Sequence, residues 1–582
     1  MGRERIQLSR RPHPNSRSLL LPSVFSPLAM APTSALFGAS PDVARRILDD
    51  IEAQFRLSKD DLVRITTQFL EDFALGLGEY NHPMAMIPTF VTGVPNGSET
   101  GTFLALDLGG TNLRVCEVEL LGNHEFVLRQ QKYKVSEALK TGEATALFDY
   151  LADSVDAFLT EFASAVPSSP TTEQPNPFAS PSLTELSPEP AVPLGLTFSF
   201  PVEQTALNRG KILTWTKGFS AKNAVGHDVV QLLQDAFNRK HLHVRCVALV
   251  NDTVGALLSR AYTSGGCLLG SIFGTGTNGA YVERVENIKK LGDSPARQNG
   301  GYMIVNTEWG AFNNTRTVLP TTPFDNKVDR ESINPRLQAY EKFISGMYLG
   351  EITRNILLSL IDAAPKPLLF NGRSSQQLNA HYGLDTAIMS EVEEAWETGR
   401  VPIVPVTVDS ANAKDEKPAA NGLPSADAAS KVPDWQSAHF TDVDKLSPDD
   451  VARLERIRGI IIQRLGLDPA DVSIRDAAIV RWASSLVANR AARLSGCAVA
   501  AVLVQTGRAK LGGGFATDEE KLIVGVDGSL IQHYPNFNAR LRESLRELVG
   551  EEVEKKVDVG LAKDGSGVGA ALCALQAIKQ GH

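Results

Sequence analysis

The residues best suited to chemistry in this sequence form a short glycine-rich turn between two apolar runs. The turn reads Asp107-Leu108-Gly109-Gly110-Thr111-Asn112, and both flanks alternate apolar with polar or small residues, which predicts a β-hairpin. Glycines let backbone N–H groups approach a polyphosphate without interference from Cβ atoms, and Thr111 and Asn112 add donors. Asp107 can hold Mg²⁺ through water. We interpret the turn as a phosphate-binding hairpin, with an ordinary hairpin as the alternative.

A second glycine turn has the same form. It reads Gly274-Thr275-Gly276-Thr277-Asn278, again between an apolar strand and an alternating strand. The run GTGTNG formally matches the dinucleotide fingerprint, but that motif and the P-loop both need a helix after the glycines. Both turns are instead followed by predicted strands. Two such hairpins in successive halves predict an α/β protein with two similar lobes and a cleft between them, which is the arrangement of the actin-like ATPase (ribonuclease H-like) fold.

A third cluster of small residues comes late in the chain. Residues 523–529, IVGVDGS, predict an apolar strand that enters a turn, and the glycines of residues 564–569 precede a helix predicted over residues 570–579. Small residues at a strand end and at a helix N-terminus let a base and a ribose lie close to the backbone. Either piece alone is more typical of a simple turn or helix cap, but after two phosphate hairpins the nucleotide interpretation gains support.

The composition narrows the class of protein. With 582 residues, 43% apolar and 21% charged, the chain is long enough for two or more domains. The net charge of −9, without a long basic cluster, makes nucleic acid and anionic membranes poor partners and favours small molecules. The five cysteines lie far apart in apolar runs, which predicts buried thiols in a reducing compartment. No apolar run approaches the length of a membrane span, and no Cys/His spacing resembles a zinc site.

Several segments lie around these motifs. Ser58 and Asp61 predict the start of an amphipathic helix, and residues 143–162 predict another. Residues 167–193 and 401–433 are rich in proline and predict surface insertions. Residues 1–35 predict a disordered or targeting extension; a mitochondrial transit peptide, a disordered segment or a start upstream of Met30 all fit, and we favour a cytoplasmic protein.

Longer motifs resemble a known family. LALDLGGTNLRV, LTFSFP, WTKGF, VNDTVGALL, GTGTNGAY, VNTEWGAF and GVDGS follow one another in the order of eukaryotic-type hexokinases, and the sequence is most similar to fungal glucokinases. The resemblance runs from about Pro41 to the C-terminus, apart from the two insertions. It implies two hexokinase halves, residues 36–257 and 258–582, that form a smaller and a larger lobe around a cleft.

The resemblance also implies the ligand-binding residues. By similarity, the sugar would be surrounded by Ser199, Phe200, Thr216, Lys217, Asn251, Asp252, Asn278, Glu308, Gln338 and Glu341. ATP would be bound by Asp107, Leu108, Gly109, Gly110, Thr111, Asn112, Gly274, Thr275, Gly276, Gly528 and Ser529, with Asp107 holding Mg²⁺ through water. Carboxylates, amides and a lysine suit a polyhydroxyl ligand, because each hydroxyl both donates and accepts.

Two residues would carry the chemistry. Asp252 follows the strand of residues 246–250, at the carboxyl end where open α/β sheets bind ligands, and would act as general base. The alternative is a simple N-cap of the next helix. Lys217 would neutralise charge on the transferred phosphoryl group, and its alternative is a solvated lysine. Glu308 lies beside Trp309 in a strand-like run, which disfavours a surface carboxylate, whereas for Glu341 periodicity does not separate the two readings.

The function implied is ATP-dependent phosphorylation of the 6-hydroxyl of D-glucose, with mannose or fructose as further candidates, at the first step of glycolysis. Mg²⁺ would bridge the phosphates, and glucose and ATP would be the partners. Two other classes stay open: a hexokinase-like sugar-sensing regulator that has lost catalysis, and an actin- or chaperone-like ATPase without a sugar site. Intact Asp252 and Lys217 disfavour the first, and the TFSFP and WTKGF segments disfavour the second.

Overall fold

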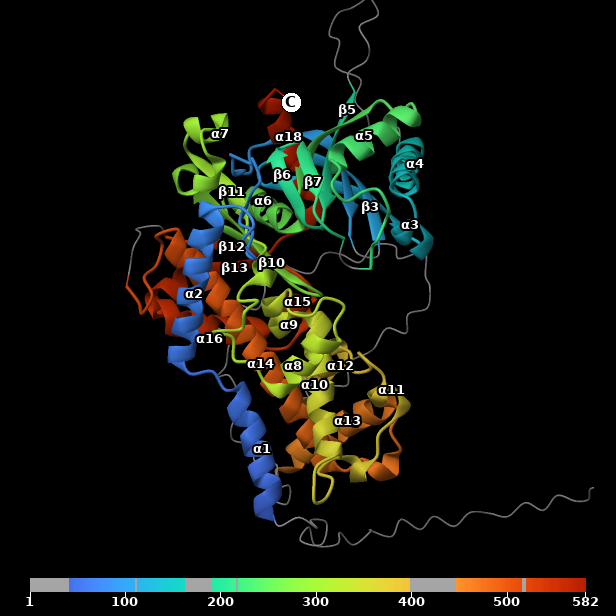
Figure 1. Ribbon diagram of the computed structural model, residues 1–582, viewed down its shortest axis with the longest axis vertical. Coiled ribbons are helices and arrows are strands. Elements are labelled where there is room, and N and C mark those ends of the chain that lie inside the picture. The colour runs from blue at the N-terminus through green and yellow to red at the C-terminus, as the bar shows by residue number, and fades with distance from the viewer. Residues whose placement is uncertain are drawn as a thin grey trace, which may run out of the picture.

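The computed structural model has two lobes, each built around one β-sheet (Figure 1). It describes residues 41–109, 112–162, 191–215, 218–397, 446–514 and 520–581. The predicted extension, residues 1–35, and the predicted insertion at 401–433 lie outside the described residues. Of the other insertion, residues 167–190 lie outside them, and the last two residues belong to a strand that begins at Val192, so our predicted boundary at 193 was wrong.

The small-lobe sheet has the strand order β4-β3-β2-β5-β8. Its strands are β2 (Thr100–Leu108), β3 (Asn112–Gly122), β4 (Glu125–Lys134), β5 (Val192–Phe198) and β8 (Val244–Val250). β2, β3 and β4 are antiparallel, whereas β5 and β8 run parallel to β2. The first predicted hairpin is therefore confirmed.

The two faces of this sheet are covered by different helices. Alternate residues of β2 point to opposite faces, as a strand requires. Leu104, Leu106 and Leu108 pack in one core with α4 (Ala144–Phe162) and α5 (Val229–Arg239). Phe103 and Ala105 pack in another core with α6 (Asp252–Ser264) and α18 (Gly565–Lys579).

The large-lobe sheet repeats the plan of the first. Its order is β1-β11-β10-β9-β12-β13, with β1 (Ile87–Pro88), β9 (Leu269–Phe273), β10 (Thr277–Arg284), β11 (Tyr302–Asn306), β12 (Leu522–Asp527) and β13 (Val557–Leu561). β9 and β10 form an antiparallel hairpin, and β12 and β13 run parallel to β9. Both lobes thus combine one glycine hairpin with two parallel strands, which agrees with the predicted two-lobed hexokinase-type fold.

Helices make up most of the rest of the large lobe (Figure 1). They are α2 (Lys59–Gly78), α8 (Pro323–Glu331), α9 (Ala339–Ile344), α10 (Gly346–Ile361), α12 (Thr386–Glu397), α13 (Pro448–Leu465), α14 (Ile474–Gln505) and α16 (Phe537–Val549). α2 begins at a capping box made by Ser58 and Asp61, as predicted. Its Phe69 stacks on Phe312 with ring centroids 3.6 Å apart, which fixes α2 on the loop after β11.

Shorter elements complete the fold. They are α1 (Pro41–Phe55), α3 (Glu137–Thr141), β6 (Val202–Ala206), β7 (Arg209–Ile212), α7 (Pro295–Gln298), α11 (Gln376–Asn379), α15 (Ser529–His533), α17 (Glu551–Lys556) and the 3₁₀ turns η3 (Val285–Asn287), η4 (Lys289–Leu291), η5 (Trp309–Ala311), η6 (Phe370–Gly372) and η9 (Pro469–Asp471). All five cysteines are free and buried, as predicted.

One helix differs from our expectation about membrane spans. Among the described residues, α14 is long and apolar enough to cross a membrane by length and composition alone. However, 89% of its apolar window is buried inside the protein. It contacts α16, α2, α13 and α10, so it serves as the central helix of the large lobe.

The last helix starts earlier than the sequence predicted. We expected the glycines of residues 564–569 to precede it, but α18 begins at Gly565 and contains all three of these glycines. A Cβ at Gly569 would lie 2.2 Å from Gly255 Cα, and one at Gly565 would lie 3.0 Å from Ala256 Cα. The glycines therefore let the backbones of α18 and α6 touch, and this close packing outweighs their low helix propensity.

Candidate active site

The first glycine hairpin holds a partly buried ion pair at its mouth. The Gly109 N–H donates to Asn112 O over 3.2 Å, which closes the turn. Asp107 accepts from Arg114 Nε at 2.9 Å and from Nη2 at 2.5 Å, across the pair of strands. Leu108 is fully buried, so only its backbone can serve a ligand. Gly110 and Thr111 lie outside the described residues.

Arg114 is a residue that our sequence analysis missed. Burial alone would lower the pKa of Arg114, but the neighbouring Asp107 carboxylate outweighs it and the pKa is raised. A permanent cation beside a phosphate-binding turn can neutralise phosphate charge. The available signal was its position, two residues after the turn on the strand that leaves it.

The second hairpin is fixed by the start of α10. Gly346 N donates to Gly274 O at 2.7 Å, and Met347 N donates to Thr275 O at 3.2 Å. The turn itself is closed by Gly274 N donating to Gly276 O at 3.0 Å. Its N–H groups and its carbonyl groups therefore have set directions before any ligand arrives.

A polar cluster of five side chains lies directly beside this hairpin. Its members are Asn278, Asn306, Glu308, Gln338 and Glu341, which we call the polar cluster. Glu341 Oε2 accepts from Thr277 N at 3.1 Å, and a Cβ at Gly276 would lie 2.7 Å from the same oxygen. A Cβ at Gly310 would lie 2.4 Å from Gln338 Oε1. Glycine at these two positions therefore makes room for the carboxylate and the amide.

The other side of the polar cluster is a hydrogen-bonded network. Asn306 Nδ2 donates to Glu308 Oε1 at 2.8 Å, and Asn306 Oδ1 accepts from Asn278 Nδ2 at 2.8 Å. Asn306 is buried at the end of β11 and was not among our predicted residues. Glu308 lies two residues beyond that strand in a left-handed conformation (φ 55°), so our placement of it within a strand was wrong.

Two predicted sugar residues of the small lobe, Ser199 and Phe200, lie at a separate cluster of aromatic side chains. Phe200 packs edge-on against Trp215 and Phe219, with ring centroids 5.0 and 4.9 Å apart. Ser199 and Phe200 are both buried and directly follow β5. The next predicted pair, Thr216 and Lys217, follows Trp215 but lies outside the described residues.

Asp252 lies at the carboxyl end of β8, as predicted, but it is not the helix cap. Asn251 is the N-cap of α6, with extended backbone angles, and its Oδ1 accepts from Thr253 N at 3.0 Å and Thr253 Oγ1 at 2.6 Å. Asp252 is the first residue of the helix, and its Oδ1 accepts from Thr253 N at 2.9 Å. Our alternative interpretation of Asp252 as an N-cap was therefore wrong.

The third glycine turn packs on the second hairpin. A Cβ at Gly274 would lie 3.1 Å from Gly528 Cα, and Gly528 has a positive φ of 110°. Burial raises the pKa of the preceding Asp527, the Gly528 N–H lowers it, and the charge of Asp252 raises it further. Asp527 is thus a second carboxylate near Asp252. Sequence analysis did not single out Asp527, although the GVDGS motif contains it.

A pocket of about 680 Å³ opens between this turn and α10. Its lining includes Thr275 and Ser529, which were predicted to bind ATP, and Met347, Tyr382 and Tyr534, which were not. Apolar and aromatic side chains beside a turn that is predicted to bind phosphate suit a flat base.

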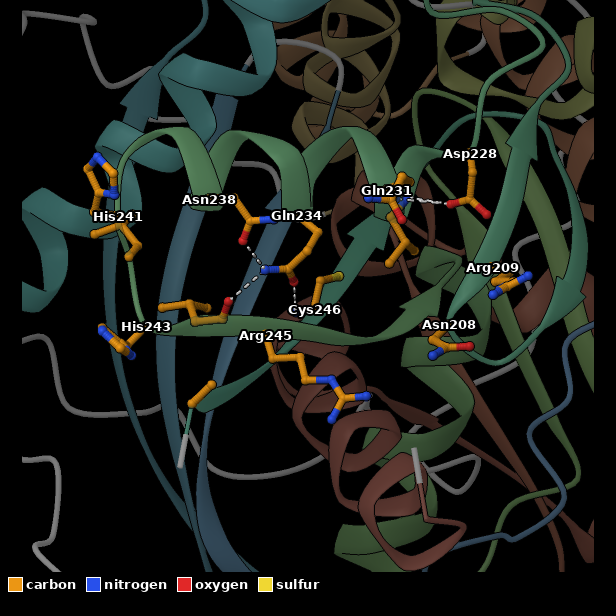
Figure 2. Close-up of a pocket in the computed structure, with 14 residues that line it drawn as sticks. Asn208, Arg209, Asp228, Gln231, Gln234, Asn238, His241, His243, Arg245 and Cys246 are labelled. Atoms are coloured by element: carbon orange, nitrogen blue, oxygen red, sulfur yellow. Dashed lines mark hydrogen bonds between the residues drawn. The ribbon is translucent and has the colours of Figure 1, made fainter. Parts of the chain in front are cut away.

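A larger cavity, about 820 Å³, lies elsewhere, between α5, β7 and β8 in the small lobe. In Figure 2, Gln234 points from α5 toward β8, where it donates to Val244 O at 3.1 Å and accepts from Cys246 N at 3.0 Å. The amide therefore joins α5 to β8. The labelled Arg209 and Arg245 of this cavity lie apart and do not point toward one another (Figure 2).

Two glycine hairpins on repeated sheets, a nucleotide-sized pocket and a polar cluster together define a kinase of the two-lobed actin-like ATPase fold. Hexokinase family models match residues 47–262 and residues 268–410 and 425–576, and the chain belongs to the hexokinase family. This confirms the resemblance seen in the sequence. The division into halves at residues 257 and 258 stays a prediction.

Curated and solved relatives agree with this assignment. The glucokinase of Aspergillus niger is 35% identical over 94% of this chain and 98% of its own length. Glucokinase-1 of Saccharomyces cerevisiae is 34% identical over 91% of this chain and 97% of its own length. The solved hexokinase from Schistosoma mansoni complexed with glucose has a TM-score of 0.69 and 31% identity, and covers 92% of this chain and 100% of its own.

Proposed function

We propose that this protein transfers the terminal phosphoryl group of ATP to the 6-hydroxyl of D-glucose, and that mannose and fructose are further substrates. The observation that carries the proposal is the polar cluster, whose Glu341 bonds the backbone of the second glycine hairpin at 3.1 Å. Hydrogen-bonding groups for a polyhydroxyl ligand thus adjoin a turn suited to phosphate. The relatives named glucokinase and the hexokinase complexed with glucose support the choice of glucose.

The side chains divide the work between binding and proton transfer. Glu308 and Glu341 accept from sugar hydroxyls, and the amides of Asn278 and Gln338 both donate and accept. Asp252 accepts the proton of the 6-hydroxyl as its oxygen attacks the terminal phosphorus, and the bond to ADP breaks. Lys217 and Arg114 supply positive charge that neutralises the charge developing on the phosphoryl oxygens. Closure of the lobes keeps out water, which would otherwise accept the phosphoryl group.

The predicted Mg²⁺ fits the carboxylates that the structure places near the glycine turns. Asp107 and Asp527 are partly or fully buried carboxylates near the ends of β2 and β12, and Mg²⁺ prefers such oxygen ligands, reached directly or through water. When bound with ATP, the cation neutralises charge on the phosphates. Asp107 would hold it with Arg114 beside it, and Asp527 is the second candidate.

The experiment is incubation of the full chain with MgATP and D-glucose, with glucose 6-phosphate and ADP as the measured products. Equal amounts of both products, formed only when sugar is present, are the expected result. Glucose binding by calorimetry without product would indicate the inactive sugar-sensing alternative. ADP formed at the same rate without any sugar binding would indicate an ATPase and would refute the proposal.

A further inference from the structure

Gln338 and Glu341 are presented by a strained turn and a short helix. The turn joins α8 to α9, and two of its non-glycine residues have left-handed backbones, Arg336 (φ 65°) and Gln338 (φ 53°). Such conformations persist only where the surroundings fix them. Contacts outside the turn must therefore hold it in place.

Asp329, in the last turn of α8, makes several of those contacts. Its Oδ1 accepts from the Arg336 N–H at 3.0 Å, from Lys342 Nζ at 2.7 Å and from Arg316 Nη2 at 2.6 Å. Lys342 Nζ also donates to Asn334 O at 2.8 Å. One carboxylate thus joins three elements: the strained turn, helix α9 and the loop after β11.

Asp329 and Lys342 are buried, so the bonds between them are strong and their geometry is specific. Asp329 is 6% exposed and Lys342 is 3% exposed. Burial alone would raise the pKa of Asp329, but the bonds from Lys342, the Arg336 N–H and Arg316 lower it, so the carboxylate is ionised. Lys342 adjoins Glu341 in sequence and lies one turn from Gln338. The carboxylate therefore acts on both predicted sugar residues through their own backbone.

We propose that Asp329 is a positioning residue of the sugar site, which sets Gln338 and Glu341 against the glycines at 310 and 276. The proposal rests on the proposed function. Asp329 itself contacts the turn and the helix that carry the sugar residues. Its loss releases the turn, and the affinity for glucose falls, while the second glycine hairpin keeps the two backbone bonds from the start of α10 that fix it.

The test is Asp329→Asn, which keeps the shape and the acceptor for the Arg336 N–H but removes the charge. We expect the Kd for glucose, measured by calorimetry, and the KM for glucose to rise about tenfold or more, because misplaced Gln338 and Glu341 side chains make weaker hydrogen bonds to the sugar hydroxyls. The KM for MgATP and kcat should stay within about threefold. A role in folding alone would lower the melting temperature without this split between the two substrates.

Glu554→Gln is the matched control. Glu554 is likewise a buried carboxylate of the large lobe with two arginine partners, Arg542 at 2.6 Å and Arg546 at 3.4 Å, but it lies on α17 beside α16. Glu554→Gln should lower the melting temperature and leave the KM for glucose unchanged. Equal effects of both variants on glucose, or an unchanged glucose Kd in folded Asp329→Asn, would overturn the proposal.

A double variant separates lost positioning from an unpaired buried lysine. Asp329→Asn with Lys342→Met removes both charges, so stability should recover in part while glucose binding stays weak. Recovery of wild-type glucose affinity would refute positioning by Asp329. If Asp329→Asn alone does not fold, Lys342→Met alone should still weaken glucose binding selectively, and wild-type glucose binding by it would overturn the proposal. Failure of the wild-type protein to bind glucose would refute the proposed function itself, which is a distinct result.

Discussion

Asp252→Asn tests the assignment of the general base most directly. Asn251, and not Asp252, caps α6, so the substitution leaves the cap in place. It removes one negative charge from the first turn of the helix, an effect of about 0.3–1 kcal/mol, and the amide oxygen can still accept from Thr253 N. We therefore expect a melting temperature within about 4 °C of wild type.

Activity should respond very differently from stability. An amide keeps the size of the carboxylate but does not take the proton of the 6-hydroxyl. Loss of general-base catalysis typically lowers the rate by about 10²–10⁴, or roughly 3–5 kcal/mol of barrier at one decade per 1.36 kcal/mol. The measurement is kcat from coupled detection of glucose 6-phosphate, together with the glucose Kd, which should stay within about tenfold.

Asp228→Asn is the matched control for this change. Asp228 caps α5 in the same lobe, where its Oδ1 accepts from Val230 N at 2.9 Å and Gln231 N at 3.1 Å. The same chemical change at a helix start should alter stability modestly and leave kcat near wild type. A folded Asp252→Asn protein with kcat within a factor of a few of wild type would refute the base assignment.

Three further predictions concern the hairpin, the helix contact and pH. Asp107→Ala should lower kcat/KM for MgATP on the order of a hundredfold, with the glucose Kd unchanged. The control is Glu117→Gln, which changes an ion-paired carboxylate farther along the same hairpin and should leave kcat/KM for MgATP unchanged. Equal kcat/KM values for the two variants would show that the hairpin is not part of the site. Gly569→Ala should destabilise the protein by about 1–3 kcal/mol, because the added Cβ would lie 2.2 Å from backbone. Gly459→Ala, where the added Cβ meets open space, should stabilise the protein by about 0.5–1 kcal/mol. The measurement is the denaturant midpoint of unfolding of each variant. Burial lowers the pKa of Lys290 from 10.5 to about 8, so the unfolded chain binds more protons between these values and stability gains as pH rises through them. Lys290→Met should remove this gain in stability. Melting temperatures of wild type and Lys290→Met that change equally from pH 8 to pH 10 would contradict the prediction.

The sequence was informative wherever local pattern decides structure. Alternating runs around glycines predicted both hairpins, because strand periodicity and turn chemistry act over a few residues. The capping box at Ser58 was likewise local, and the structure has it. Ordered motifs then sufficed for the family. These features need no knowledge of what packs against them.

Other features depend on contacts between distant segments. Asn and Asp cap helices about equally well, so sequence did not choose between Asn251 and Asp252. The glycines of α18 look like helix breakers until α6 is packed against them. Asn306 and Asp329 are ordinary polar residues in sequence, and only their partners, 28 residues away for Asn278 and 13 for Lys342, show what they do.

The contact between α6 and α18 also bears on how the lobes can move. α18 packs on the small-lobe strands β2, β5 and β8, whereas α6 also packs on the large-lobe strands β9 and β12. Where the two helices meet at Gly255 and Gly569, backbone meets backbone, so at this point one helix can slide along the other without displacing a side chain. Packed helices that slide in this way allow shear between domains. A single methyl group at this contact would therefore alter the rate of domain motion as well as the stability of the fold.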